Sequence, residues 1–140
     1  MSLYLDTSVI LSHFVTDANS DRADALLGEY PEPIVISDLC AAEFAAGLSR
    51  LVRMREITHT AAVATLSNFD VWSSQFVQRD VITPADWATA ERLLRRLDLP
   101  LLTPDMLHVA VATRLGTRLA TFDQRMHRVA ASLSVDVLGG

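Results

Sequence analysis

The sequence contains no lysine: its twelve basic residues are all arginine, and seventeen acidic residues outnumber them. The resulting formal net charge of −5 argues against binding nucleic acid through a generally basic surface, which requires an excess of cations. It does not exclude a metal-dependent site, because bound cations reverse the local sign of a cluster of acids. Arginine favours bidentate contacts with phosphate and carboxylate groups, although a GC-rich coding sequence is the simpler explanation for its exclusive use.

Long apolar runs and paired cysteines are also missing. Half of the residues are hydrophobic, but every apolar run is broken well short of the ~20 residues that a transmembrane helix needs. Cys40 is the only cysteine, which excludes an internal disulfide and a thiolate metal site. The first residues reach Asp6 without a basic leader, so no signal peptide is visible. These absences predict a cytoplasmic protein with no membrane segment.

Short apolar segments alternate with longer helical ones along the chain. We expect strands at 3–6, 34–36, 77–82, 118–122 and 135–138. We expect helices at 8–15, 20–28, 38–55, 58–76, 84–97, 104–115 and 124–131. No repeat, low-complexity tract or linker divides the chain, so residues 1–140 are expected to form one domain. The alternation predicts a three-layer α/β/α sandwich with a mainly parallel central sheet.

Two acids directly follow predicted strands. Asp6 ends the run Leu3-Tyr4-Leu5, and Asp123 follows the strand at 118–122. Ligands of parallel α/β sheets bind outside the carboxyl ends of the strands, near a switch in strand order. We therefore expect Asp6 and Asp123 at the same edge of the sheet. Each is equally well placed to cap the helix that follows it.

A third acid, Asp105, lies at the start of a helix. Thr103 is expected to cap this helix and Pro104 to be its first residue. The dipole of a helix favours any acid in the first turn. Thr83-Pro84-Ala85-Asp86 begins another helix in nearly the same way, and we assign Asp86 no catalytic role. Asp105 is therefore a site candidate only in combination with the other acids.

The fourth acid, Glu43, lies within an alanine-rich helix. Its neighbours three and four residues away are Leu39, Cys40, Ala46 and Gly47, none of which is a cation. A glutamate in packed surroundings bears a desolvation cost unless it is paired or bound to a ligand. Two interpretations of Glu43 are open on this pattern alone: an unpaired residue of a site, or a residue on an exposed stripe of the helix.

Together the four acids predict a metal site. Clustered carboxylates repel one another, and they become jointly ionised at neutral pH when a divalent cation neutralises them. Mg²⁺ and Mn²⁺ prefer oxygen ligands, and one or two such ions can promote hydrolysis of a phosphodiester. The chain is then a hydrolytic nuclease whose catalytic and metal-binding residues are Asp6, Glu43, Asp105 and Asp123.

Polar residues next to these acids are expected to support them. Ser8 and Thr121 are placed to position a carboxylate or a water molecule, whereas Thr7 is more simply a helix cap. His108 lies one helical turn after Asp105. We expect it to pack in the core or to support the acids rather than to bind metal.

The acids occur in four segments with a recognisable order. These are Leu5-Asp6-Thr7-Ser8, Glu43, Thr103-Pro104-Asp105-Met106-Leu107-His108-Val109-Ala110 and Thr121-Phe122-Asp123. In their order, their spacing and the total length, the chain resembles the PIN domain, specifically the VapC-like ribonuclease toxins of toxin–antitoxin pairs. The resemblance implies an Mg²⁺- or Mn²⁺-dependent endoribonuclease that cleaves RNA. It also implies that the four acids bind the metal, with Ser8 and Thr121 in support.

The resemblance further implies a cognate small antitoxin and, as in many relatives, a homodimer. We expect a segment of the antitoxin to cross the acidic pocket and to insert an arginine or lysine between the carboxylates. The hairpin of the helices at 38–55 and 58–76 is the candidate surface for holding it. Two other functions remain open, a catalytically silent PIN-like binding module and a housekeeping PIN ribonuclease without an antitoxin. A receiver-like phosphotransfer protein requires a lysine, which the chain lacks.

Overall fold

Five short strands form one parallel sheet in the order β3-β2-β1-β4-β5. The strands are β1 Leu3–Leu5, β2 Ile34–Ser37, β3 Val77–Asp80, β4 Arg118–Ala120 and β5 Val137–Leu138. The computed structural model describes all 140 residues. Strand β1 lies at the centre, with Leu3 opposite Ile34 of β2 and Arg118 of β4. The strand order changes direction beside β1, so the carboxyl ends of β1 and β4 flank the switch point of the sheet.

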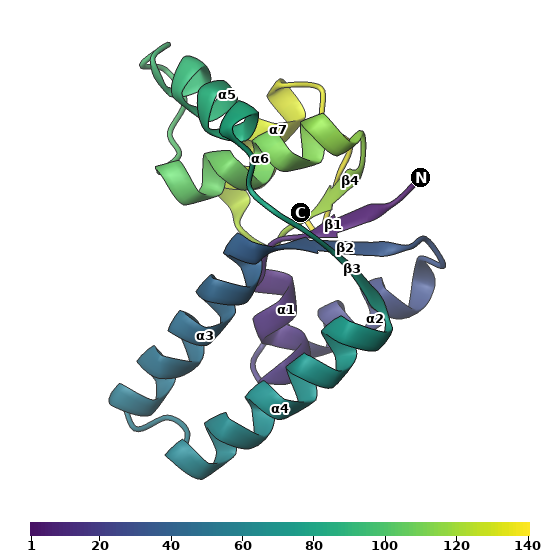
Figure 1. Ribbon diagram of the computed structural model, residues 1–140, viewed down its shortest axis with the longest axis vertical. Coiled ribbons are helices and arrows are strands. Elements are labelled where there is room, and N and C mark those ends of the chain that lie inside the picture. The colour runs from purple at the N-terminus through teal and green to yellow at the C-terminus, as the bar shows by residue number, and fades with distance from the viewer.

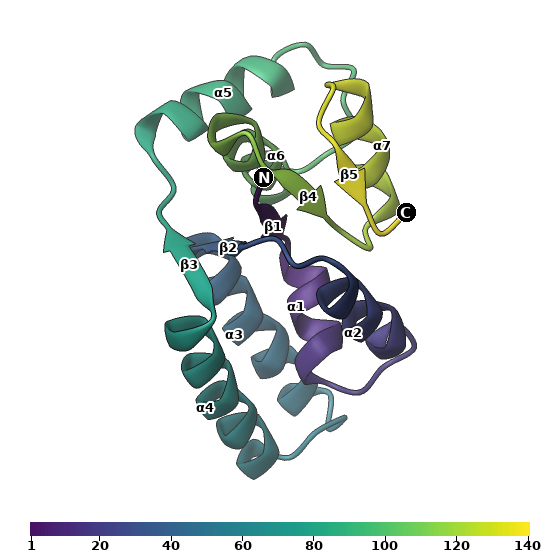
Figure 2. The ribbon, with the colours of Figure 1, turned by 90° about the vertical axis from the view of Figure 1, so that its right-hand side faces the viewer.

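Helices cover both faces of the sheet. They are α1 Thr7–Phe14, α2 Ser20–Glu29, α3 Asp38–Arg53, α4 His59–Gln75, α5 Pro84–Leu94, α6 Thr103–Leu115 and α7 Gln124–Ser132. Figure 2 shows α1 to α4 below the sheet and α5 to α7 above it, and in Figure 1 α3 and α4 form a hairpin that extends away from the sheet. The predicted three-layer α/β/α sandwich is confirmed. None of these helices is both long and apolar enough to cross a bilayer.

Two predicted helices are too long at their carboxyl ends. Helix α3 ends at Arg53 rather than at 55, and Arg55 has a φ of 59°. Helix α5 ends at Leu94 rather than at 97, and Leu97 has a φ of 67°. A right-handed helix requires a negative φ, so neither helix can continue through its left-handed residue.

Four of the five predicted strands are too long, whereas β2 extends one residue beyond its predicted end, to Ser37. Strand β3 stops at Asp80 because the backbone N–H groups of Val81 and Ile82 donate to the carboxylates of Asp80 and Asp38. Strand β4 stops at Ala120. The Thr121 N–H still donates to the Leu138 carbonyl, but the N–H groups of Phe122 and Asp123 donate to the hydroxyls of Ser8 and Thr121. The last strand, β5, begins two residues later than predicted. Side-chain acceptors at the carboxyl edge thus replace part of the expected sheet.

The start of α6 contradicts the prediction that Thr103 is its cap. Leu102 is the N-cap, and Thr103 is the first helical residue. Thr83 does cap α5 as predicted, since its hydroxyl accepts from the backbone N–H of Asp86. Asp86 and Asp105 therefore both lie three residues after their caps. Because leucine has no side-chain acceptor, α6 lacks the capping box that α5 has.

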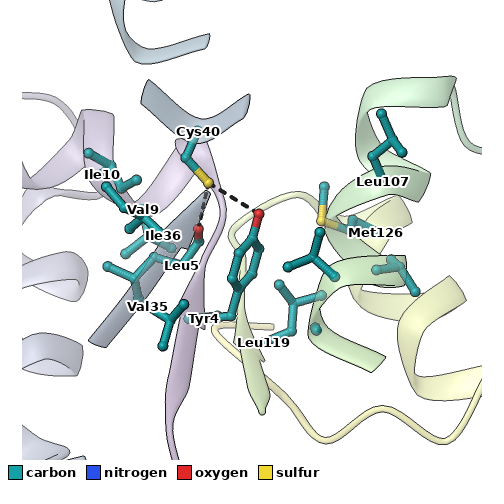
Figure 3. Close-up of a cluster of buried hydrophobic side chains, with 14 of the residues drawn as sticks. Tyr4, Leu5, Val9, Ile10, Val35, Ile36, Cys40, Leu107, Leu119 and Met126 are labelled. Carbon is teal, nitrogen blue, oxygen red and sulfur yellow. Dashed lines mark hydrogen bonds between the residues drawn. The ribbon is translucent and has the colours of Figure 1, made fainter. Parts of the chain in front are cut away.

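A polar group lies inside the core beside β1. Leu3, Tyr4 and Leu5 are almost completely buried. As Figure 3 shows, the Tyr4 hydroxyl lies 3.3 Å from Sγ of Cys40, and Cys40 Sγ also donates to the carbonyl oxygen of Leu5 at 3.2 Å. A buried tyrosine hydroxyl needs a hydrogen-bond partner, and here it has several. This cluster joins β1 to the start of α3.

Candidate active site

Asp6 connects the carboxyl ends of β1 and β4. Its carboxylate is buried, with Oδ1 accepting from the Ser8 hydroxyl at 2.6 Å and from the Val9 N–H at 3.3 Å. Oδ2 accepts from the Thr121 hydroxyl at 2.6 Å. Burial raises the pKa of Asp6, and the hydrogen bonds from Ser8 and Thr121 only partly oppose this rise. Asp6 is thus a helix cap, as one interpretation predicted, and it is also bonded to both predicted supporting residues.

Asp123 lies on the same edge and caps α7. Its Oδ1 accepts from the N–H groups of Arg125 and Met126 at 2.9 and 3.0 Å. Its own N–H donates to the Thr121 hydroxyl at 3.0 Å. Thr121 therefore bridges Asp6 and Asp123, and Oδ2 of Asp123 makes no hydrogen bond within the chain.

Asp105 has no hydrogen bond or ion pair within the chain, although it is half-buried. It lines a pocket of about 310 Å³ together with Asp123, Arg125 and residues of the segment before α6. Burial raises the pKa of Asp105, and the charge of Asp123 raises it further. His108 opposes this rise, and Glu43 and Asp6 add smaller increases. The charges of the other three acids therefore all disfavour ionised Asp105.

Asp86 occupies the position in α5 that corresponds to Asp105 in α6, and its role is structural. Its Oδ2 accepts from the Thr83 N–H at 2.9 Å, which completes the capping box. The Arg114 guanidinium donates to both of its oxygens, at 2.8 and 3.0 Å. Every strong acceptor of Asp86 is satisfied, whereas Asp105 has none of these partners.

Glu43 is paired, contrary to the prediction that no cation lies near it. Its Oε1 accepts from the Thr7 hydroxyl at 2.9 Å and lies 2.5 Å from Nε2 of His108. The partner is 65 residues away in the sequence and is brought in by α6, so helical neighbours did not reveal it. Burial alone would raise the pKa of Glu43, but the hydrogen bonds and charge of His108, with Thr7, lower it.

No three carboxylate, imidazole or thiol groups converge closely enough to bind one metal ion in this conformation. The predicted cage is therefore not preformed, which agrees with repulsion between uncompensated carboxylates. The oxygens without a hydrogen bond include both of Asp105, Oδ2 of Asp123 and Oε2 of Glu43. Free carboxylate oxygens are the ligands that Mg²⁺ and Mn²⁺ prefer, so these residues fit such an ion chemically. Their assignment as ligands remains a prediction.

Two further contacts near this edge were missed or misassigned from the sequence. Thr7 was expected to cap α1, but Asp6 is the cap and Thr7 donates to Glu43 instead. The contact between Tyr4 and His108, at 2.7 Å, was not predicted at all. The available signals were a hydroxyl inside an aliphatic strand and an imidazole one turn from Asp105, because both groups need partners when buried.

The fold and the acids together define a class of protein, a parallel α/β domain with clustered carboxylates at the carboxyl edge of its sheet. The model of the PIN domain family matches residues 3–132. The chain therefore belongs to the PIN domain family, as its motifs predicted.

Solved structures of similar fold include proteins of toxin–antitoxin systems. VapC20 from Mycobacterium tuberculosis, a sarcin–ricin loop cleaving toxin, is similar with a TM-score of 0.71 and 23% identity, over 91% of this chain and 95% of that chain. VapBC2 from Rickettsia felis, bound to a promoter DNA fragment, has a TM-score of 0.71 and 16% identity, over 99% of this chain and 98% of that chain. FitAcB from Neisseria gonorrhoeae has a TM-score of 0.67 and 19% identity, over 97% of this chain and 96% of that chain. No curated protein sequence matches the chain. At these identities the likeness shows the fold.

Proposed function

We propose that the protein is a metal-dependent endoribonuclease that acts as the toxin of a toxin–antitoxin pair. The observation that carries this proposal is Asp105, an acid without a partner that shares a pocket with Asp123 at the switch point of the sheet. A carboxylate that the fold leaves uncompensated among other acids is suited to a cation. Membership of the PIN domain family and the similarity to toxins such as VapC20 support the same function.

In this proposal Asp6, Glu43, Asp105 and Asp123 hold Mg²⁺ or Mn²⁺. When bound, the ion would lower the pKa of the attacking water and offset the charge of the phosphodiester. Ser8 and Thr121 fix the Asp6 carboxylate through the two 2.6 Å hydrogen bonds. Arg125 lines the pocket beside Asp105 and Asp123, where its guanidinium is placed to meet an RNA phosphate.

Asp6→Asn should lower RNA cleavage by about a hundredfold or more, the scale for losing one charge-stabilising group. Asparagine keeps an acceptor for Ser8 and Val9, and the Thr121 hydroxyl can accept from the new amide, so the fold should persist. The measurement is cleavage of total RNA with Mg²⁺ or Mn²⁺, with the ends mapped. Asp70→Asn, at an exposed position of α4, is the matched control. Full activity of Asp6→Asn, or undiminished cleavage in EDTA, would contradict the proposal.

An inhibitory partner is the second part of the proposal. The two complexes VapBC2 and FitAcB share this fold, which supports a small antitoxin as partner. The hairpin of α3 and α4 carries a groove of about 250 Å³ whose apolar lining includes Leu48, Ala62, Val63 and Leu66. Val63 is 49% exposed there, so it is available to an apolar segment of the antitoxin. A basic side chain from the same partner would reach the uncompensated acids.

Val63→Asp should weaken binding of the antitoxin encoded beside this gene by tenfold or more, since the complex would bury an unpaired carboxylate, which costs more than the ~2 kcal/mol of a neutral polar group. Cleavage by the free protein should not change, because the groove is separate from the acids. Affinity is measured by titration calorimetry, and Asn68→Asp on the same helix controls for added charge outside the groove. Tight, inhibitory binding to Val63→Asp would exclude this groove as the antitoxin site.

A further inference from the structure

A buried chain of hydrogen bonds runs from the centre of the sheet to Glu43. The Tyr4 hydroxyl lies 2.8 Å from Oγ of Ser37 and 2.7 Å from Nδ1 of His108. On the other side of the imidazole ring, Nε2 lies 2.5 Å from Oε1 of Glu43. Tyr4 and His108 are 0% and 1% exposed, so neither group exchanges these partners for water. These hydrogen bonds connect β1, α6 and α3.

The direction of the last hydrogen bond does not depend on the charge of the imidazole. In the neutral ring, Tyr4 donates to Nδ1, so the proton is on Nε2 and is donated to Glu43. In the protonated ring, Nδ1–H donates to the Tyr4 oxygen, whose own proton is free for Ser37, and Nε2–H still donates to Glu43. His108 therefore presents a donor to Glu43 in either state.

The Glu43 side chain needs a fixed hydrogen-bond partner to act as a metal ligand. Its side chain has several rotatable bonds and is 31% exposed, so alone it would sample solvent-directed conformations. Thr7 and His108 both hold Oε1 and leave Oε2 without a hydrogen bond. One oxygen is thus used as an anchor, and the other remains available as a ligand.

We propose that His108, itself fixed by Tyr4, is a positioning residue that holds Glu43 ready for the metal. The proposal rests on the function proposed above. Such supporting hydrogen bonds orient ligands, and their loss typically weakens metal binding roughly 10–100-fold.

The test is Mn²⁺ affinity, measured by titration calorimetry on RNA-free protein. His108→Leu fills a similar volume without a donor, and it should weaken Mn²⁺ binding roughly 10–100-fold. His108→Gln brings an amide N–H near the position of Nε2 and should retain most of the affinity. In a Glu43→Gln background, His108→Leu should cause little further loss, because both changes remove the same ligand. Tyr4→Phe, which deletes only a hydroxyl, should weaken binding by a smaller factor.

The outcomes separate this inference from the proposed function. If the wild-type protein does not bind Mn²⁺, or if Glu43→Gln binds it equally well, the metal site itself is wrong. If Glu43→Gln loses affinity but His108→Leu does not, only the positioning role is wrong. Equal losses in His108→Leu and His108→Gln would indicate a packing role and would also overturn it. If His108→Leu does not fold, as judged by circular dichroism, the Tyr4→Phe variant decides. Unchanged Mn²⁺ affinity in Tyr4→Phe would show that the hydrogen bonds from Tyr4 through His108 do not position Glu43.

Discussion

Asp105→Asn should abolish RNA cleavage and at the same time stabilise the metal-free protein. The activity should fall about a hundredfold or more, because the variant loses a proposed ligand and no other residue can replace it. The melting temperature should rise, because burial and the charges of Asp123, Glu43 and Asp6 disfavour the ionised Asp105 and together outweigh the opposing charge of His108. No hydrogen bond is lost in exchange, since Asp105 makes none within the chain. A gain in stability with a loss of activity is typical of a residue retained for function.

Both properties can be measured on one preparation. Cleavage is followed under single-turnover conditions with saturating Mn²⁺, and thermal unfolding is followed in EDTA. Adding Mn²⁺ at 100 times its Kd should then stabilise the wild-type protein by about 2.7 kcal/mol. It should stabilise Asp105→Asn much less. A variant that loses stability and keeps its activity would show that Asp105 is a structural acid like Asp86.

The fold was predictable because its signals are local. Apolar strands such as Leu3–Leu5 and Ile34–Ser37 alternate with capped helices, and this order alone implies a covered parallel sheet. The errors occurred where one side chain or one backbone angle decides an element's end. Arg55 and Leu97 adopt left-handed backbone without being glycine, and neither position carries a sequence signal for that conformation.

The site was predictable only in part, for the same physical reason. Asp6 and Asp123 could be placed at one edge because each follows a strand of a parallel sheet. The pairing of Glu43 with His108 depends on how α3 and α6 pack, which no local pattern reports. Glu43 is therefore not an unpaired acid, and the prediction that it has no partner is wrong. The acid without a partner is Asp105. Its sequence context resembles that of the structural acid Asp86, so the sequence alone did not distinguish the two.

Asp86→Asn should have the opposite effects to Asp105→Asn: reduced stability with cleavage close to wild type. The side chain is 1% exposed and accepts from Arg114 at 2.8 and 3.0 Å. Asparagine can still accept from the Thr83 N–H, but it turns one acceptor for Arg114 into a donor. We expect a loss of about 1.5–3 kcal/mol in the free energy of unfolding, the range for hydrogen bonds to charged groups. Urea unfolding at pH 7 measures it.

The pH dependence of this loss provides an independent check. Burial alone would raise the pKa of Asp86, but the hydrogen bonds from Arg114 and Thr83 lower it below its ordinary value of 3.8. A carboxyl group with a lowered pKa in the folded state contributes stability that is present above the unfolded pKa. That contribution is lost as the pH falls through the lower folded pKa.

The difference in stability between the wild-type protein and Asp86→Asn should therefore be constant above about pH 5 and should shrink below about pH 3.8. Other acids titrate in this range as well, but they are common to both proteins and cancel in the difference. Arg114→Met should give a similar loss, and the double variant should lose much less than the sum because the two residues share one interaction. Additive losses, or a difference that grows in acid, would show that Asp86 does not stabilise the fold through Arg114.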